Sequence, residues 1–221
     1  MNQNELLDLL TMGEAAKDLR YLLSRSYGRT SAVNFIGDKY LLDKEERHIL
    51  FRAVYPPEDA EKRRNKLISI EKVENKVLAI DGYNQIIVVE SLLNRLPIID
   101  CDDGFIRDIT GVFSNYKVSN VTYDAIKLIL DLVVEYLPKK TLFYFDQPIS
   151  KSGELAMEVK KRLMEYGLEG DAGAVKQPDR EVLNEGEIVA SSDGIIIDSA
   201  EMIVDLAGYI VRKSKKKLVK I

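Results

Sequence analysis

The chain has 221 residues, of which 46% are hydrophobic and 31% are charged, a composition typical of a globular protein with its own core. One histidine, His48, and one cysteine, Cys101, exclude an internal disulfide and a zinc site built mainly from histidine or cysteine. No apolar run is long enough to span a membrane, and the first ten residues lack the basic start of a secretory signal. We therefore expect a cytoplasmic protein with no membrane partner, whose chemistry, if it is an enzyme, rests on carboxylates and a bound cation.

The net charge of −4 is unevenly distributed. Residues 1–70 contain 12 basic and 11 acidic residues, residues 71–211 contain 14 and 25, and residues 212–221 contain six basic residues and no acidic one. We interpret these ranges as a helical N-terminal domain, an acidic α/β domain and a basic tail. Carboxylates crowded into a compact body repel one another, which bound cations offset. The alternative is an acidic surface that is simply solvated.

The first 70 residues have the apolar spacing of amphipathic helices, with leucines and alanines recurring every three or four residues. Asp43 is a predicted helix N-cap, and Glu46 stands three residues later as its capping-box partner. The pair Pro56-Pro57 is expected to interrupt the chain before a short charged helix.

From residue 76 onward, predicted strands alternate with predicted helices. Buried strands are predicted at residues 77–80 and 141–145, further strands at residues 98–99 and 187–190, and an edge strand at residues 173–175. Helices are predicted at residues 122–137, 153–166 and 199–211, and residues 86–93 fit either element. This alternation predicts an α/β fold in three layers, with helices on both faces of a parallel sheet. Ligands bind such folds beyond the carboxyl ends of the strands.

Three of the predicted strands lead to an aspartate: Asp81, Asp146 and Asp193. Parallel strands place these three residues at the same edge of the sheet. Carboxylates held close together must protonate or share a cation, and Mg²⁺ or Mn²⁺ prefers such oxygen ligands. We therefore predict that Asp81, Asp146 and Asp193 form a catalytic metal site. For each aspartate taken alone, the alternative is a helix cap or a turn.

A second acidic cluster lies between these strands. Asp102 or Asp103 is a candidate to complete the metal site, the alternative being a tight turn with exposed charges. Glu90 competes for the same role. Asp198 is expected either to cap the last helix or to reach a second metal ion, and Arg107 is a candidate phosphate ligand.

The loop after Asp146 leads into a predicted helix through Ser150, Lys151 and Ser152. Backbone N–H groups and the dipole at a helix N-terminus hold phosphates, so we take these three residues as candidate phosphate ligands. The spacing of a P-loop is absent. The alternative is a serine cap followed by Glu154 in the first helical turn.

Arginines and tyrosines are mixed in the N-terminal part, and six basic residues end the chain. Arginines grip phosphates and aromatic rings stack on unpaired bases, so RNA is the expected partner. The alternative is that these residues serve only the core and a solvated surface. The sequence does not fix the oligomeric state, and a homodimer is compatible with it.

The segment Val77-Leu78-Ala79-Ile80-Asp81-Gly82-Tyr83-Asn84 resembles the opening of an NYN domain, a branch of the PIN-like nucleases. Val189-Ala190-Ser191-Ser192-Asp193 resembles the late PIN motif, in which a strand leads to a Ser/Thr-rich turn and an aspartate. The resemblance implies metal-dependent cleavage of RNA by an activated water, with Asp81 and Asp193 as metal ligands. It implies further that Asp146 and one of Asp102 and Asp103 complete the acidic set, while Asn84 orients a ligand or a water.

The whole chain also resembles a largely archaeal family that joins a short helical domain to a PIN-like domain. The matching segments are Tyr21-Leu22-Leu23-Ser24-Arg25, Glu46-Arg47, Asp102-Asp103-Gly104 and Ser150-Lys151-Ser152-Gly153-Glu154. That resemblance implies the domain arrangement and no activity.

These observations lead to three hypotheses. The first is a metal-dependent ribonuclease that uses the acidic cluster to activate water. The second is a catalytically inactive RNA- or ribosome-binding module on the same fold. The third is a phosphatase or phosphotransferase acting on a small molecule, since a fold by itself does not decide the chemistry.

Overall fold

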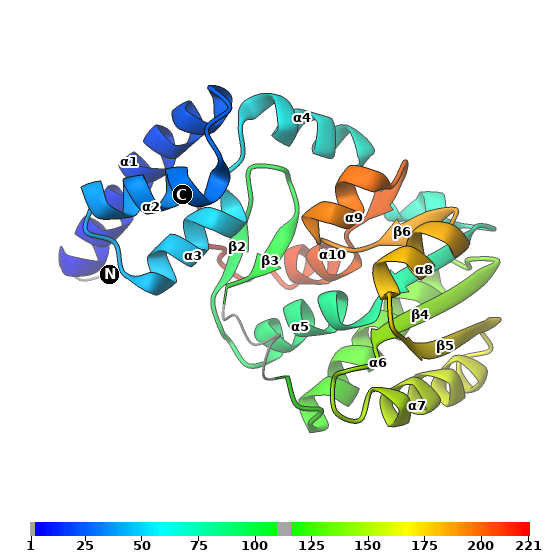
Figure 1. The fold of residues 1–221 in the computed structure, drawn as a ribbon. Helices are drawn as coiled ribbons and strands as arrows, with labels where there is room; N and C mark the ends of the chain where they lie inside the picture. The colour runs from blue at the N-terminus through cyan, green and yellow to red at the C-terminus, as the bar shows by residue number, and fades with distance from the viewer. Residues whose placement is uncertain (1–2, 110–115) are drawn as a thin grey trace.

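A computed structural model describes residues 3–109 and 116–221 of the chain, with side chains described from Leu10 onward. Within these residues, five strands form one parallel sheet in the order β5-β4-β1-β6-β7 (Figure 1). The strands are β1 (Val77–Asp81), β4 (Lys140–Asp146), β5 (Gly170–Val175), β6 (Ile188–Ala190) and β7 (Ile203–Val204). This arrangement confirms the predicted α/β class and its parallel sheet.

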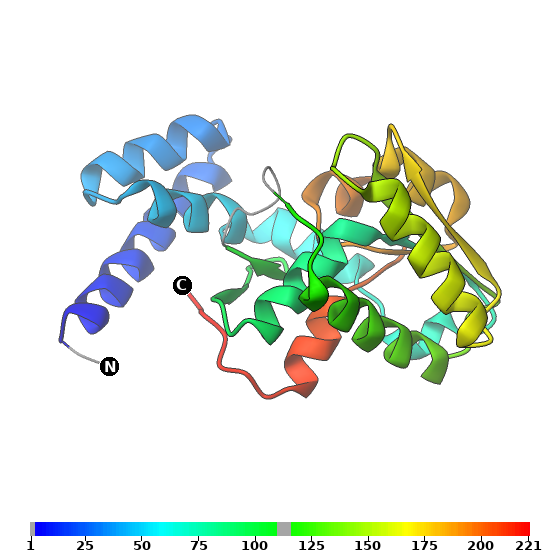
Figure 2. The ribbon, with the colours of Figure 1, turned by 90° about the horizontal axis from the view of Figure 1, so that it is seen from below.

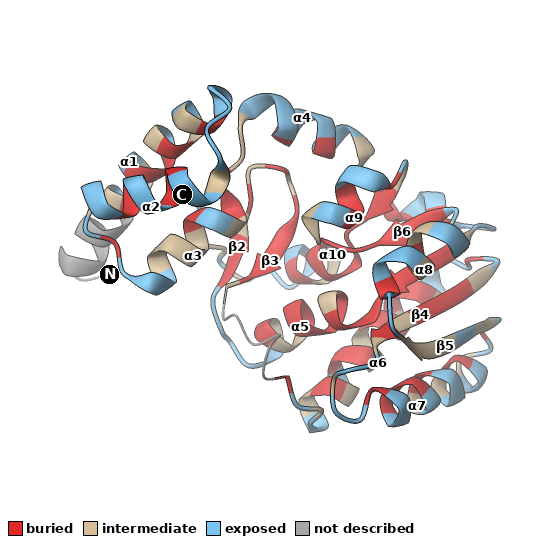
Figure 3. Cartoon of the chain, in the orientation of Figure 1, coloured by how far each residue is buried: buried red, intermediate tan, exposed pale blue. Residues whose placement is uncertain are grey.

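The sheet is covered by helices on both faces, which makes three layers (Figure 1). Ile80 and Phe143 point into the larger core, which is built with α5 (Gly82–Leu93), α6 (Asn120–Glu135), α7 (Ser152–Glu165) and α10 (Leu206–Lys213). Ala79 and Leu142 point to the other face, against α8 (Pro178–Glu185) and α9 (Gly194–Ser199). Successive side chains on a strand face opposite ways, so a strand buried on both faces needs an unbroken apolar run. The central strands are buried accordingly, and β5 at the sheet edge is only partly so (Figure 3).

The N-terminal part consists of α1 (Gln3–Ser24), α2 (Arg29–Lys39), α3 (Lys44–Ala53) and α4 (Pro57–Lys66), followed by the short 3-10 helix η1 (Ile70–Val73). Leu19, Ile36 and Leu50 belong to a hydrophobic cluster that is separate from those of the sheet. The predicted capping box is confirmed: Asp43 accepts from the Glu46 N–H, and Glu46 accepts from the Asp43 N–H, each at 2.8 Å. Figure 2 shows these helices lying beside the sheet and its covering helices.

The structure decides one open alternative and changes two predicted elements. Residues 86–93, which fitted either element, are helical as part of α5. The strand predicted at residues 98–99 exists as β2 (Ile98–Asp100), but it pairs with β3 (Ile106–Asp108) in an antiparallel hairpin outside the main sheet. The helix predicted over residues 199–211 is wrong, because α9 ends at Ser199 and β7 pairs with β6 before α10 begins. Asp205 caps α10 by accepting from the Gly208 N–H at 2.8 Å, which fixes the break.

Residues 212–221, the predicted basic tail, contact other parts of the chain. Arg212 and Lys213 still belong to α10, and Val219 lies beside β2 as an added strand residue. The Val219 N–H donates to the Ile98 carbonyl at 2.9 Å, and the final carbonyl, of Ile221, accepts from Arg20 of α1 at 2.8 Å. The chain end therefore lies between the hairpin and the N-terminal helices (Figure 2). Among the described residues, no helix combines the length and apolar character needed to cross a membrane.

Candidate active site at the carboxyl edge of the sheet

Five aspartates line one cleft of about 350 Å³ at the carboxyl edge of the parallel sheet, and four of them end or follow its strands. Asp81 ends β1, Asp146 ends β4, and Asp193 follows β6. Asp179, in the first turn of α8, follows β5 and joins them. The structure thus brings together the three strand-end aspartates singled out by the sequence and adds Asp179 to them. The fifth aspartate, Asp108, ends β3 of the hairpin.

Asp81 is the most buried of the four, with 7% of its surface exposed. Its carboxylate accepts a hydrogen bond from the Ser191 hydroxyl at 2.9 Å, and it does not cap the helix that follows it. The pKa of Asp81 is raised to about 7, mainly by burial; the Ser191 hydrogen bond opposes this rise, and the charges of Asp179, Asp193 and Asp146 contribute to it. A carboxyl group in this state binds either a proton or a metal ion.

Asp146 and Asp179 also have raised pKa values. Burial raises the pKa of Asp146, and the neighbouring charge of Asp179 adds to the effect. Burial likewise raises the pKa of Asp179, with Asp193 adding repulsion. Asp193 also caps α9, accepting from the Ile195 N–H at 2.8 Å, so the capping interpretation and the cleft position both hold for it. In the described part of the chain, none of the four forms an ion pair.

Asn84 also lines the cleft, one turn into α5. Its side-chain oxygen accepts from the backbone N–H of Ser192 at 2.8 Å and from the Ser192 hydroxyl at 3.0 Å. These bonds tie the start of α5 to the turn that leads to Asp193. The Asn84 oxygen is therefore occupied by protein, and its direct effect is to hold two cleft-forming segments together.

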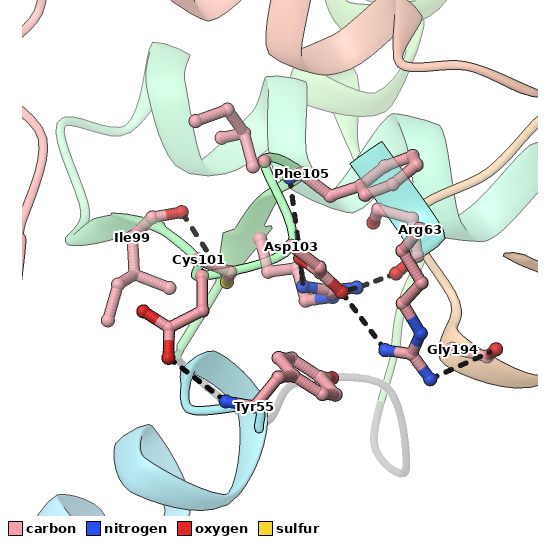
Figure 4. A network of polar contacts seen from close by, with 12 residues as sticks. Tyr55, Arg63, Ile99, Cys101, Asp103, Phe105 and Gly194 are labelled. Carbon is pink, nitrogen blue, oxygen red and sulfur yellow. Dashed lines mark hydrogen bonds and ion pairs between the residues drawn. The ribbon is translucent and has the colours of Figure 1, made fainter. Parts of the chain in front are cut away.

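Three predicted metal ligands are not in the cleft, because arginines bind their carboxylates. Asp102 accepts from the Arg20 Nε and Nη2 at 2.7 Å each, and Asp198 accepts from the Arg63 Nε and Nη2 at 2.7 Å each. Asp103 is fully buried between Arg63, at 3.0 Å, and Arg107, at 2.8 Å (Figure 4). A carboxylate whose oxygens already accept hydrogen bonds from a guanidinium group is a poor ligand for a metal ion. The prediction that Asp102, Asp103 or Asp198 completes the site is therefore corrected.

The predicted phosphate ligands also lie elsewhere. Arg107 is buried, and its Nε donates to the Ser192 carbonyl at 2.8 Å, so its contacts are structural. Lys151 lines a different pocket, beside the N-terminal end of α6, and Ser150 is not in the cleft. The Ser152 hydroxyl donates to the Gln147 carbonyl at 3.1 Å and closes its own loop.

Glu90, the remaining competitor for the acidic set, is also engaged away from the cleft. It accepts from the hydroxyls of Thr122, at 2.6 Å, and Tyr116, at 2.8 Å. Burial raises the pKa of Glu90, and the two hydrogen bonds oppose this rise. Glu90 is therefore a half-buried carboxyl group whose contacts lie inside the helical layer.

A family model described as a domain of unknown function, DUF5616, matches residues 70–209. The chain belongs to this family. A second model, described as a protein of unknown function, DUF434, matches residues 11–66. An uncharacterized protein of Methanocaldococcus jannaschii is 33% identical over 210 residues, which cover 94% of this chain and all of that relative. No solved structure matches the chain.

The DUF5616 part and the helical part both contribute cleft residues that the sequence did not single out. Asp179 follows β5 after a short loop, so the strand-end rule that found Asp81 would have found it too. Asp108 ends β3, and Arg52 comes from α3. The Arg52 guanidinium lies 3.8 Å from the Asp108 carboxylate. No local signal points to Arg52, because only the packing of α3 against the hairpin brings it there.

Proposed function

We propose that this DUF5616 protein is a PIN-like nuclease that cleaves RNA with the help of a divalent cation at the cleft of Asp81, Asp146, Asp179 and Asp193. The observation that carries the proposal is that these four carboxylates share one cleft at the carboxyl edge of a parallel sheet without basic partners of their own. Ligands of open α/β sheets bind at this edge. The proposed place of action is the cytoplasm.

The donor set fits Mg²⁺ or Mn²⁺. Carboxylate oxygens are hard ligands, and a cation here would favour the ionised form of Asp81, whose pKa is raised first by burial and then by the neighbouring carboxylates. Among the described residues, no three acidic, histidine or cysteine side chains converge closely enough to hold a metal ion by themselves. Mg²⁺ is commonly held by one or two carboxylates together with waters and substrate phosphates. A site completed by the substrate agrees with that arrangement.

When bound, such a cation polarises a phosphoryl oxygen and lowers the pKa of a coordinated water. Asp81 and Asp193 would hold it, as their positions at the ends of neighbouring strands β1 and β6 allow. Asp146 and Asp179 have raised pKa values, which suits them to take the proton from an attacking water. Arg52, a cation in the same cleft, would hold the negatively charged phosphodiester against the acidic side chains.

A second candidate function is an RNA-binding module without cleavage. The observation in its favour is that no group of three ligating side chains converges in the described part of the chain. The cleft would then keep the clustered carboxylates of a nuclease but bind no catalytic metal ion.

The deciding experiment incubates the full chain with structured and unstructured RNAs in Mn²⁺, Mg²⁺ or EDTA. The test variant is Asp81→Asn, which keeps the side-chain size and removes the charge. The matched control is Asp171→Asn, because Asp171 lies on β5 near its start and pairs with Lys160 outside the cleft. We expect cleavage that needs the metal, survives in the control and is lost in Asp81→Asn. Cleavage that persists in a folded Asp81→Asn variant would sink the mechanism. RNA binding without cleavage in any cation would favour the binding module.

A further inference from the structure

A second and larger cleft, of about 800 Å³, adjoins the carboxylate cleft. Arg52, Asp193 and Ile195 line both, so the two clefts are continuous. One wall of the larger cleft comes from the N-terminal helices, and the other comes from the turn between β6 and α9. The helical part of the chain therefore builds half of a surface that leads directly to the acidic side chains.

The helical wall of this cleft is cationic. Arg63 and Arg107 are neutralised by Asp103 and Asp198, as described above. Arg29 has no carboxylate partner among the described residues, and its Nη1 donates to the carbonyls of Phe51, at 2.9 Å, and Val54, at 2.7 Å.

Burial lowers the pKa of Arg29, and the positive charges of Arg63 and Arg107 act in the same direction against the opposing effect of Tyr55. Arg52 adds a second cation, whose carboxylate neighbour Asp108 is 3.8 Å away. Half-buried guanidinium groups held in this way are stabilised by an anion such as a phosphate.

Aromatic and apolar surface accompanies these charges. The Tyr55 ring lies between two guanidinium groups, those of Arg29 at 4.3 Å and Arg63 at 4.4 Å, so it holds the cationic wall in place. Phe51 is 41% exposed and Ile195, on the opposite wall, is 70% exposed. An exposed ring beside arginines is a stacking surface for an unpaired base.

His48 gives an independent sign that a ligand binds here. It lines the same cleft, and its Nε2 is a buried polar atom for which the described residues provide no hydrogen-bond partner. A buried polar atom left without a partner costs free energy. A rotation of the half-buried imidazole would let a phosphate oxygen or a base edge in the cleft supply one.

We propose that the larger cleft binds a single-stranded RNA segment, with phosphates at Arg29 and Arg52 and a base stacked on Phe51, and leads the next phosphodiester into the carboxylate cleft. The choice of RNA as the ligand rests on the function proposed above. A single strand is favoured because the bases of a duplex are paired and cannot stack on a side chain. The helical domain then acts as the substrate-binding half of a two-part site.

The test measures binding of a fluorescent single-stranded RNA decamer to the full chain in EDTA, over a range of salt concentrations. Each phosphate neutralised by protein on a single strand contributes about 0.7 to the slope of log K against log salt. We expect Arg52→Gln and Arg29→Gln each to weaken binding at low salt and to reduce that slope by about 0.7. Arg25→Gln is the matched control, because Arg25 is exposed in the same domain, lies over Tyr21 and is outside the cleft. It should leave the slope unchanged.

A third variant separates stacking from charge. Phe51→Leu keeps apolar volume and removes the ring, so we expect binding about fivefold weaker or more, with an unchanged salt slope. Slopes that are equal in Arg52→Gln, Arg29→Gln and Arg25→Gln overturn the proposal, as does a duplex decamer that binds as tightly as the single strand. Thermal unfolding of each variant checks the fold, since Arg29 also holds backbone carbonyls of α3 and the residue after it.

The outcomes keep the two proposals apart. Binding in EDTA that depends on Arg29 and Arg52, without cleavage in any cation, supports this cleft and rejects the nuclease. Metal-dependent cleavage together with binding that ignores Arg29→Gln and Phe51→Leu supports the nuclease and rejects this cleft, because Arg29 and Phe51 line only the larger cleft.

Discussion

The guanidinium of Arg63, in α4, donates to the Asp103 carboxylate at 3.0 Å, and that carboxylate is fully buried beside the β2–β3 hairpin (Figure 4). Asp103 also accepts two hydrogen bonds from Arg107, while Arg63 reaches Asp198 of α9 with its other nitrogens. One buried carboxylate therefore connects the helical part to the hairpin, and through Arg63 to the turn that carries Asp193. The walls of both clefts are held in register by this network.

We expect Asp103→Ala to lower the free energy of unfolding by about 3–5 kcal/mol. The substitution leaves the Arg107 charge buried without its counter-charge. Urea denaturation followed by circular dichroism measures the loss. The control is Asp38→Ala, whose partner Arg47 is paired at the surface, where 78% of the Asp38 side chain is exposed. That variant should lose less than about 1 kcal/mol, and equal losses in the two variants would contradict the structural role of Asp103.

The acidic cleft and the arginine-bound aspartates show what the sequence can and cannot predict. Asp81, Asp146 and Asp193 each follow a buried strand, and parallel strands must bring such residues to one edge. Asp102 and Asp103 carry the same local chemistry. Asp103 has one local partner, Arg107, four residues further on. However, the Asp102 partner Arg20 and the second Asp103 partner Arg63 lie 82 and 40 residues away in the chain. Pairings at that separation are decided by how α1 and α4 pack, which no local pattern encodes.

The error at residues 199–211 has a different physical origin. The apolar spacing there fits one helix, yet Ile203 and Val204 pair with β6, and Asp205 begins a new helix by capping it. Pairing with an existing sheet edge and a side-chain cap both outweigh the weak preference of a short segment for helix. The local sequence contains the capping residue Asp205, but it does not show that residues 203–204 pair with β6.

A second prediction concerns Gly82, which follows Asp81 and lies against the ring of Phe145. A Cβ at this position would lie 2.3 Å from the Phe145 Cε1, and Phe145 is a fully buried core residue. We expect Gly82→Ala to cost about 1–3 kcal/mol of stability through overpacking and to shift Asp81. Gly153→Ala is the control, since a Cβ at Gly153 meets no atom within 4 Å, and that variant should be neutral or slightly stabilising. Differential scanning calorimetry compares them, and equal melting temperatures would contradict the close approach.

Asp179 provides a test of the cleft residue that the sequence did not single out. We expect Asp179→Asn to lower Mn²⁺ affinity and kcat/KM for RNA by about 10- to 100-fold, because it removes one of the four charges that a cation would offset. Calorimetric titration with Mn²⁺ gives the affinity independently of activity. Glu181→Gln makes a similar charge change on the same helix outside the cleft. If both variants bind Mn²⁺ like the parent protein, Asp179 takes no part in the site.

The raised pKa of Asp81 makes stability depend on pH in a definite direction. In the folded protein this pKa is about 7, against an ordinary value of 3.8, so between these values the folded state holds a proton that the unfolded state has released. The resulting stabilisation is complete below about pH 4 and is lost as the pH rises towards 7, by up to about 1.4 kcal/mol per pH unit. Asp81→Asn removes this titration while keeping the side-chain size.

We therefore expect the free energy of unfolding of the parent protein, minus that of Asp81→Asn, to fall between pH 4 and 7 and to level off above pH 7. Urea denaturation at half-unit pH intervals measures this difference, which also cancels the titration of groups common to both proteins. At pH 8, where Asp81 is ionised and repelled by its neighbours, Mg²⁺ should raise the melting temperature of the parent protein more than that of the variant. A difference that does not change with pH would show that Asp81 titrates normally. A Mg²⁺ effect of equal size in both proteins would place the cation away from Asp81.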